Sequence, residues 1–141
     1  MTRILLVTLA VVALALWLRS RQTVRSAAAQ ADPSRIGSPD ADRQTLHALR
    51  DAGADLTKPT EVNFYLYFPT EAAATAAAAQ AWSSSLPTRV VPGAMDSGWL
   101  CLASGTLVPT DEAIRAASTR LQAVAAEHGG EYDGWEAAVE R

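Results

Sequence analysis

A short sequence motif occurs twice in this chain of 141 residues and limits the folds that the chain can adopt. An apolar stretch typical of a strand ends at a proline, a threonine follows, and an acidic residue opens a helical stretch. The two copies are Pro69–Glu71 and Pro109–Asp111, forty residues apart. The threonine can cap the helix, and the acid interacts favourably with its N-terminus. The motif therefore predicts two units in which a strand is followed directly by a helix.

The hydrophobic periodicity supplies the remaining elements. Apolar residues alternate with polar or tyrosine residues over Val62–Phe68, which predicts a half-buried strand. Further stretches predict helices over Asp40–Ala52, Thr70–Trp82 and Thr110–His128, and strands within Leu86–Gly93 and Trp99–Val108. The order α-β-α-β-β-α indicates an α+β fold, a two-layer sandwich that is a ferredoxin-like variant with an added first helix. The fourth strand of that plan is not evident.

The sequence of the N-terminal segment predicts a membrane helix. Ile4–Leu18 contains no charged residue and spans about 22 Å as a helix, somewhat less than a hydrocarbon core of about 30 Å. Flanking arginines can extend to the headgroups. We expect an anchor over residues 1–25, a flexible linker over 26–41 and a regulatory domain over 42–141. The side chains expected in the membrane include Ile4, Leu5, Leu6, Val11, Leu14, Leu16 and Trp17.

The arginines that flank this segment predict its orientation. Arg19, Arg21 and Arg25 follow it, whereas Arg3 and the terminal amine precede it. The positive-inside rule then places a single-pass protein in the inner membrane with its C-terminal domain in the cytoplasm. The alternative is a signal peptide cleaved near Ala29–Ala31, which would make the domain an exported one.

Charge is unequally distributed along the chain. Residues 1–39 carry five arginines and one aspartate, a net charge of +4, and residues 40–141 carry seven basic and fourteen acidic side chains, a net charge of −7. An acidic domain repels phosphate backbones, so direct binding of nucleic acid is disfavoured. The balance favours a basic protein partner.

The sequence contains no recognisable catalytic constellation. His47 and His128 are the only histidines, and His128 lies where a helix-end histidine is favoured by the dipole. Cys101, the only cysteine, falls in a strand pattern and is expected to be a small buried hydrophobe. Clustered metal ligands and a glycine-rich phosphate loop are both lacking. We expect no enzyme activity, cofactor or metal.

The alternating strand brings aromatic side chains to one sheet face. If its apolar residues pack on the helices, Asn63, Tyr65 and Tyr67 lie on the opposite face, and Trp99 is placed to join them. RNA-recognition domains stack bases on such a face. The alternative is that the first helix or the C-terminal segment covers it.

The C-terminal stretch HGGEYDGWE contains acidic and aromatic residues that the end of a helix does not require. Gly129 can close the last helix in a left-handed conformation, and Gly130 can relax the turn. The acids that follow would repel the helix C-terminus. Tyr132, Asp133 and Trp135 are therefore candidates for a binding edge, although the tyrosine and tryptophan are equally suited to pack in the core, which we favour for Trp135.

Three stretches resemble the regulator of ribonuclease activity B family, protein inhibitors of ribonuclease E. They are LRDAGADLTKPTEVNFYLYFPTEAAATAAA at Leu49–Ala78, WLCLASGTLVPTDEAI at Trp99–Ile114 and RLQAVAAEHGGEYDGWE at Arg120–Glu136. The resemblance covers residues 40–136 and implies a non-enzymatic α+β regulator that binds ribonuclease E outside its catalytic domain. The apolar N-terminus departs from those soluble inhibitors.

The resemblance and the charge pattern lead to one main expectation. The chain is a membrane-tethered regulator whose acidic domain is attracted to arginine-rich, disordered segments of a ribonuclease E-type partner. An RNA-binding module that uses the aromatic face, and an exported domain with another partner, are the alternatives.

Overall fold

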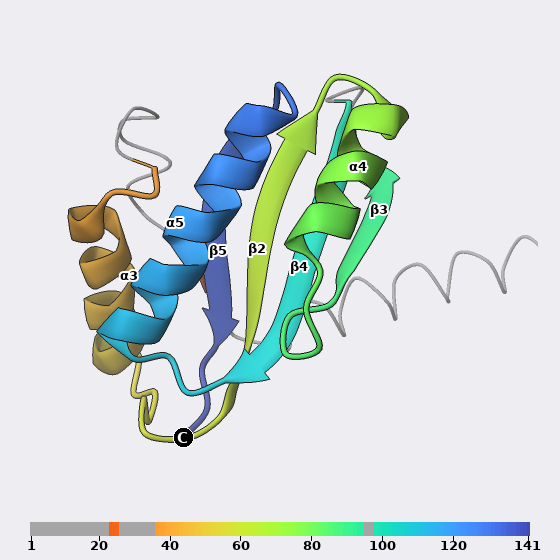
Figure 1. The fold of residues 1–141 in the computed structure, drawn as a ribbon. Helices are drawn as coiled ribbons and strands as arrows, with labels where there is room; N and C mark the ends of the chain where they lie inside the picture. The colour runs from red at the N-terminus through yellow and green to blue at the C-terminus, as the bar shows by residue number, and fades with distance from the viewer. Residues whose placement is uncertain (1–22, 26–35, 95–97) are drawn as a thin grey trace, which may run out of the picture.

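The computed structural model of the chain describes residues 23–25, 36–94 and 98–141 (Figure 1). The elements in chain order are β1 (Thr23–Arg25), α3 (Pro39–Asp51), β2 (Thr60–Phe68), α4 (Glu71–Ala81), β3 (Thr88–Pro92), β4 (Trp99–Leu107), α5 (Asp111–Glu127) and β5 (Glu131–Ala138). The three predicted helices and the three predicted strands are all present, with bounds shifted by a few residues.

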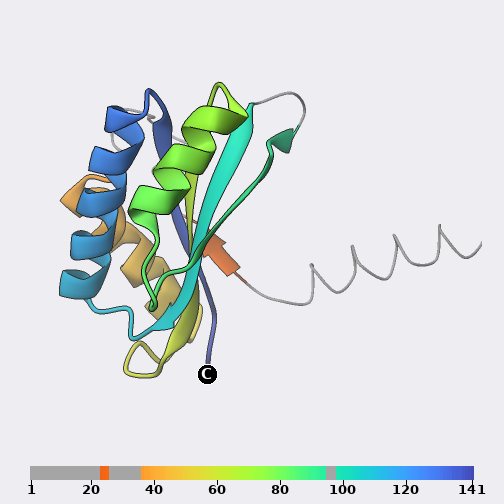
Figure 2. The same cartoon turned by 45° about the vertical axis from the view of Figure 1, so that its right-hand side comes forward.

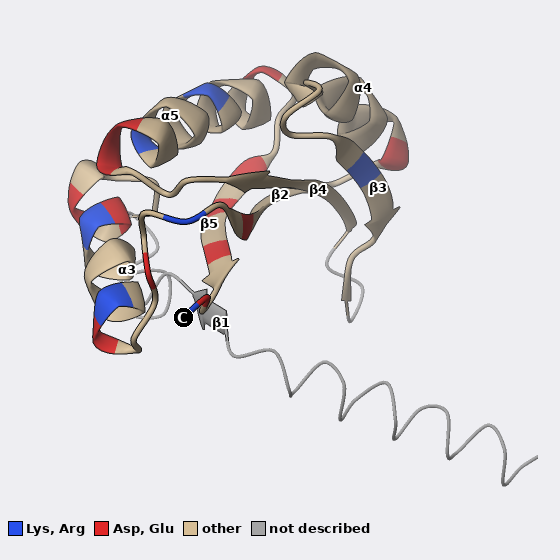
Figure 3. Ribbon diagram, turned by 90° about the horizontal axis from the view of Figure 1, so that it is seen from below, with Lys and Arg blue, Asp and Glu red and all other residues tan. Residues whose placement is uncertain are grey.

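The strands form one antiparallel sheet in the order β1-β5-β2-β4-β3. From β2 onward the chain runs β-α-β-β-α-β, and each helix connects two strands that are not neighbours in the sheet. Helices α4 and α5 lie side by side on one face of the sheet (Figure 2), and α3 packs against α5 beside the edge that β5 and β1 form (Figure 3). The predicted α+β class is confirmed.

In both copies of the strand-to-helix motif the threonine caps the helix, as the sequence predicts. The side chain of Thr70 accepts a hydrogen bond from the backbone N–H of Ala73 (3.2 Å), and Thr110 accepts one from Ala113 (3.0 Å). Both threonines have extended backbone angles, as a residue at this position requires. Each threonine begins a helix that returns across the same sheet face.

Strand β5 corrects the predicted α-β-α-β-β-α order, because the stretch after the last helix is itself a strand. Tyr132 and Trp135 are three positions apart, so a regular strand would send them to opposite faces. The pairing with β2 shifts register between Phe64 and Leu66, and Gly134 has φ +89°. This bulge turns both aromatic side chains toward the helices. The bulge interrupts the two-residue period that identifies a strand, so the hydrophobic pattern did not predict β5.

A glycine is required at position 130 by close packing that could not be predicted from the sequence. A Cβ at this position would lie 2.4 Å from the ring of Phe68 and 2.5 Å from the carbonyl oxygen of Tyr67. Gly129, by contrast, has open space around it but φ +69°, which favours glycine. One glycine therefore ends α5, and the other lets β5 start in close contact with the end of β2.

The core lies between the sheet and the two helices above it. Phe64, at the centre of β2, is fully buried and contacts Trp135 of β5, with 6.4 Å between the ring centroids. Alanines of α4 face the same core and let that helix approach the sheet closely. Cys101 is buried here, and burial raises the pKa of its thiol to about 11. This supports the expectation of an unreactive core cysteine.

The expected membrane anchor falls largely outside the described residues, as do most of the residues of the expected linker. Residues 23–25, at the end of the predicted anchor, form β1 and pair with β5. Helix α3 begins at Pro39, three residues before the predicted start of the domain. Of the helices that the structure describes, none combines the length and the hydropathy needed to cross a bilayer.

Candidate functional site

The sheet face opposite α4 and α5 is the candidate binding surface (Figure 3). On this face Asn63, Tyr65 and Tyr67 of β2 lie beside Ser104, Leu102 and Leu100 of β4, their respective register partners. The three predicted residues of β2 are partly exposed, whereas Val62, Phe64, Leu66 and Phe68 are buried beneath the helices. The strand thus divides its residues between core and surface as the alternation predicted.

Strand β5 gives this face an acidic margin. Glu136 pairs with Asn63 and Glu131 with Tyr67, so both carboxylates share the face of their partners. Asp133 follows Tyr132, whose side chain points to α5, and strand alternation therefore places Asp133 on the same side. We call the set Asn63, Tyr65, Tyr67, Leu100, Glu131, Asp133 and Glu136 the open face.

Two hydrogen bonds fix the orientation of side chains on this sheet face. The hydroxyl of Tyr65 donates to the carboxylate of Glu136, and the hydroxyl of Ser104 donates to Oδ1 of Asn63 (2.5 Å). Carboxylates accept charge-assisted hydrogen bonds from guanidinium groups, and tyrosine rings offer them a stacking surface. The chemistry of the open face therefore suits arginine side chains.

One end of the open face is hollowed. An open depression of about 440 Å³ lies where the end of β2 meets the start of β5, and Glu131 contributes its acidic wall. Its lining residues are Tyr67, Phe68, Pro69, Gly98, Gly129, Gly130 and Glu131. Gly129 and Gly130 of the HGGEYDGWE stretch thus help to line a recess at one end of the candidate surface.

Three residues predicted for the binding surface lie elsewhere. Trp99 pairs with Phe68, so it lies on the helix-covered face and packs against the core rather than beside Tyr65. Tyr132 and Trp135 are also core residues, with exposed fractions of 9% and 2%. Trp135 therefore has the packing role that we favoured for it. Asp133 alone of the three C-terminal candidates reaches the open face.

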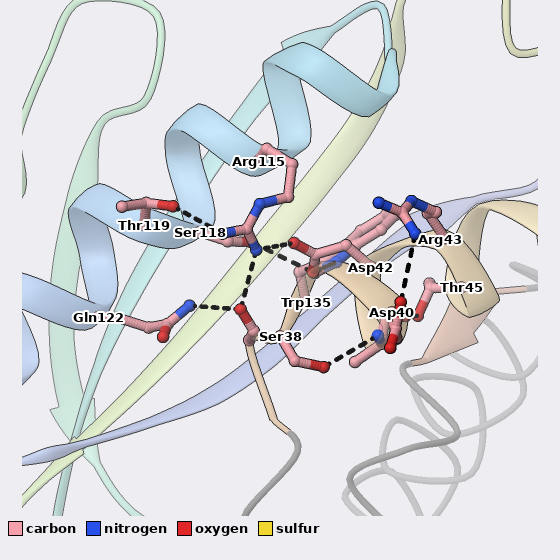
Figure 4. A network of polar contacts seen from close by, with 12 residues as sticks. Ser38, Asp40, Asp42, Arg43, Thr45, Arg115, Ser118, Thr119, Gln122 and Trp135 are labelled. Carbon is pink, nitrogen blue, oxygen red and sulfur yellow. Dashed lines mark hydrogen bonds and ion pairs between the residues drawn. The ribbon is translucent and has the colours of Figure 1, made fainter.

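The buried side chains of β5 join a polar cluster that we call the Asp42 network (Figure 4). Asp42 of α3 is 1% exposed. Its Oδ1 accepts hydrogen bonds from Nε1 of Trp135 (3.0 Å) and from Oγ of Ser118 (3.3 Å), and its Oδ2 pairs with Nη1 of Arg115 (3.0 Å). The Ser118 hydroxyl also contacts the hydroxyl of Tyr132 (3.1 Å). The network joins α3, α5 and β5.

Burial is the main influence on the titration of this network. It raises the pKa of Asp42, and the hydrogen bonds from Trp135, Arg115 and Ser118 oppose that rise only in part. It also raises the pKa of Tyr132. Because Asp42 and Tyr132 are enclosed by protein, we assign the network the role of holding α3, α5 and β5 together. Asp42, Leu46 and Leu49 share the i, i+4, i+7 face of α3, which is the signal that would have predicted a buried aspartate.

In the part of the chain that the structure describes, the other polar and titratable side chains do not cluster into a second site. Nε2 of His128 contacts Oε1 of Gln80 (2.6 Å), which bridges the ends of α5 and α4 on the exposed surface. Within residues 36–94 and 98–141, no group of three His, Cys, Asp or Glu side chains is placed to hold a metal ion.

The protein is a small α+β domain, with an acidic and aromatic surface on one sheet face and a buried polar network that joins α3, α5 and β5. A scan against protein families matches residues 39–137 to the family described as regulator of ribonuclease activity B. The chain belongs to this regulatory family, and the resemblance seen in the sequence is confirmed. A search among curated proteins finds no match.

Proposed function

We propose that the protein regulates a ribonuclease E-type enzyme by binding it, without catalysing a reaction itself. Membership of the family supports the ribonuclease as the target. The single structural observation that carries the proposal is the open face, on which three carboxylates of β5 flank the tyrosines of β2. The partner segment that this chemistry fits is basic and flexible, and arginine-rich disordered regions have both properties.

The same observation disfavours direct RNA binding by the open face. Tyr65 and Tyr67 are positioned as stacking residues would be. However, Glu131, Asp133 and Glu136 line the same surface and would repel a phosphate backbone. A gel shift with single-stranded RNA at low salt tests this directly, and a shift that Tyr65→Ala abolishes would favour the RNA alternative.

Charge reversal on the open face is expected to abolish capture of the enzyme. The variant Glu131→Lys/Asp133→Lys/Glu136→Lys should bind purified ribonuclease E-type enzyme at least about 30-fold more weakly than wild type, because three attractive charges become repulsive. Surface-immobilised full chain in mild detergent, titrated with the enzyme, gives the affinities. Wild-type binding should also weaken as salt is added.

A matched control separates the surface from the total charge. Asp51, Glu112 and Glu127 are exposed and lie on the helices, away from the open face. Changing all three to lysine alters the net charge equally, and we expect it to preserve most of the affinity. Equal losses in both triple variants would mean that the open face is not the binding surface.

We further propose that the N-terminal segment that precedes β1 tethers the domain to the inner membrane, with the domain in the cytoplasm. The support is the uncharged stretch Ile4–Leu18 and the arginines that follow it. Wild type should sediment with membranes after carbonate extraction, and the variant Val11→Arg/Leu14→Arg should not. An N-terminus beginning after Ala31 in the native protein would instead support the exported alternative.

A further inference from the structure

The outer edge of β5 already accepts an added strand. Residues 23–25 form β1, which pairs antiparallel with Ala138, Ala137 and Glu136. Strand β5 has eight residues, and its other edge is paired with β2. Strand β1 therefore covers less than half of this edge, and so short a pairing contributes only a few ladder hydrogen bonds.

Because of its bulge, β5 presents a regular strand edge only at the position that β1 occupies. The register with β2 shifts at Gly134, so the regular part of β5 runs from Trp135 to Ala138. Bulges interrupt the ladder and discourage pairing next to them. A strand that docks on this edge must therefore take the place of β1.

Strand β5 does not need β1 to keep its position. On its inner edge it pairs with β2, and Trp135 is anchored in the core. Beyond the strand, the carbonyl of Glu140 accepts a hydrogen bond from the backbone N–H of Asp55 (2.7 Å), and the carbonyl of Arg141 accepts one from Nζ of Lys58 (3.3 Å). The edge would remain in place if β1 departed.

Charge indicates what kind of strand fits. Strand β5 carries Glu131, Asp133 and Glu136, and residues 1–39, which supply β1, have a net charge of +4. Opposite charges on neighbouring strands stabilise their pairing. The other edge of the sheet, β3, carries Arg89 and ends at Pro92, which has no N–H to donate. An arginine-containing strand therefore suits the β5 edge and not the β3 edge.

We propose that the outer edge of β5 is a strand-docking site, where an extended arginine-containing segment of the protein partner pairs in place of β1. Strand β1 then acts as an internal competitor that keeps the edge occupied until the partner binds. The identity of the partner rests on the proposed function, whereas the docking itself does not. Addition of a strand supplies affinity through main-chain hydrogen bonds, and the neighbouring carboxylates supply the preference for arginine.

A disulfide between β1 and β5 tests the competition. Thr23 and Ala138 are register partners, and paired residues in antiparallel strands have Cα separations that a disulfide can bridge. The variant is Thr23→Cys/Ala138→Cys in the full chain, in mild detergent. Cys101 is buried, with its thiol pKa raised to about 11, so it should not compete for oxidation. The reduced form of the same variant is the matched control.

The probe is a fluorescent peptide with the sequence of residues 19–28, RSRQTVRSAA. A control peptide with proline in place of the valine has the same charge and cannot pair as a regular strand. Fluorescence anisotropy should show that the reduced variant binds the probe at least tenfold more tightly than the oxidised form does. The control peptide should bind weakly to both.

A second variant weakens β1 without a cross-link. Val24→Pro disfavours the strand conformation of β1, so the full chain should bind the probe at least threefold more tightly than wild type. Val24→Thr keeps a strand-forming residue and should leave affinity unchanged. Equal binding of the probe by the oxidised and reduced forms would overturn the proposal, as would failure of the disulfide to form.

Capture of the ribonuclease E-type enzyme separates this proposal from the proposed function. If the oxidised form loses the enzyme as well as the probe, the enzyme docks on the β5 edge. If the oxidised form still binds the enzyme normally, the enzyme remains the partner and the edge proposal is overturned. If the probe behaves as expected but no form captures the enzyme, the docking site stands and the ribonuclease is not its partner.

Discussion

Trp135→Ala is expected to lower the free energy of unfolding by about 4 kcal/mol, the largest loss of any single substitution considered. The indole is 2% exposed and packs against Phe64 at the centre of the sheet. Its removal leaves a cavity and also takes away the hydrogen bond from Nε1 to Asp42. Urea unfolding of the full chain, followed by circular dichroism, measures the change.

Trp135→Phe distinguishes packing from hydrogen bonding at the same position. Phenylalanine keeps an aromatic ring but has no N–H, while Asp42 still accepts hydrogen bonds from Ser118 and Arg115. We expect this variant to lose about 1–2 kcal/mol. A loss below about 1 kcal/mol for Trp135→Ala would contradict the placement of this residue in the core.

Asp42→Ala is expected to cost about 3 kcal/mol, because it leaves the enclosed N–H of Trp135 without its acceptor and separates Arg115 from its partner. Asp42→Asn is the matched variant. Its side-chain oxygen can still accept from Trp135, so we expect a smaller loss, about 1 kcal/mol. Equal losses in the two variants would mean that the charge of Asp42 matters more than its role as an acceptor.

The pH dependence of these variants follows from the raised pKa of Asp42. In the folded protein this carboxyl binds its proton at a higher pH than the reference value of 3.8 that applies when it is exposed. Between those two pKa values the folded state binds more protons than the unfolded state, so lowering the pH favours folding. Wild type should therefore gain stability relative to Asp42→Asn as the pH falls, and the gain should end below about 3.8.

The elements that local patterns specify were predictable from the sequence. The alternation along β2 and the capped starts of α4 and α5 are properties of a few adjacent residues, and the structure reproduces them. Strand β5 was missed because the bulge at Gly134 destroys the period that identifies a strand. The β1 pairing depends on two segments more than a hundred residues apart, so no local pattern could reveal it.

The composition of the candidate surface was predictable only in part, for the same reason. Asn63, Tyr65 and Tyr67 were placed correctly because their face follows from alternation within one strand. Trp99 was assigned to the wrong face because that assignment requires the register between β2 and β4. Register depends on tertiary packing, and a shift of one residue reverses every side chain.

The rate of RNA cleavage by a purified ribonuclease E-type enzyme, measured as the full chain is titrated in, tests the central claim most directly. We expect a saturable fall in rate, because a bound regulator restrains the enzyme. The variant Glu131→Lys/Asp133→Lys/Glu136→Lys should have little effect at the same concentrations, whereas Asp51→Lys/Glu112→Lys/Glu127→Lys should act like wild type. An unchanged rate at a wild-type concentration that saturates binding would contradict the regulatory role.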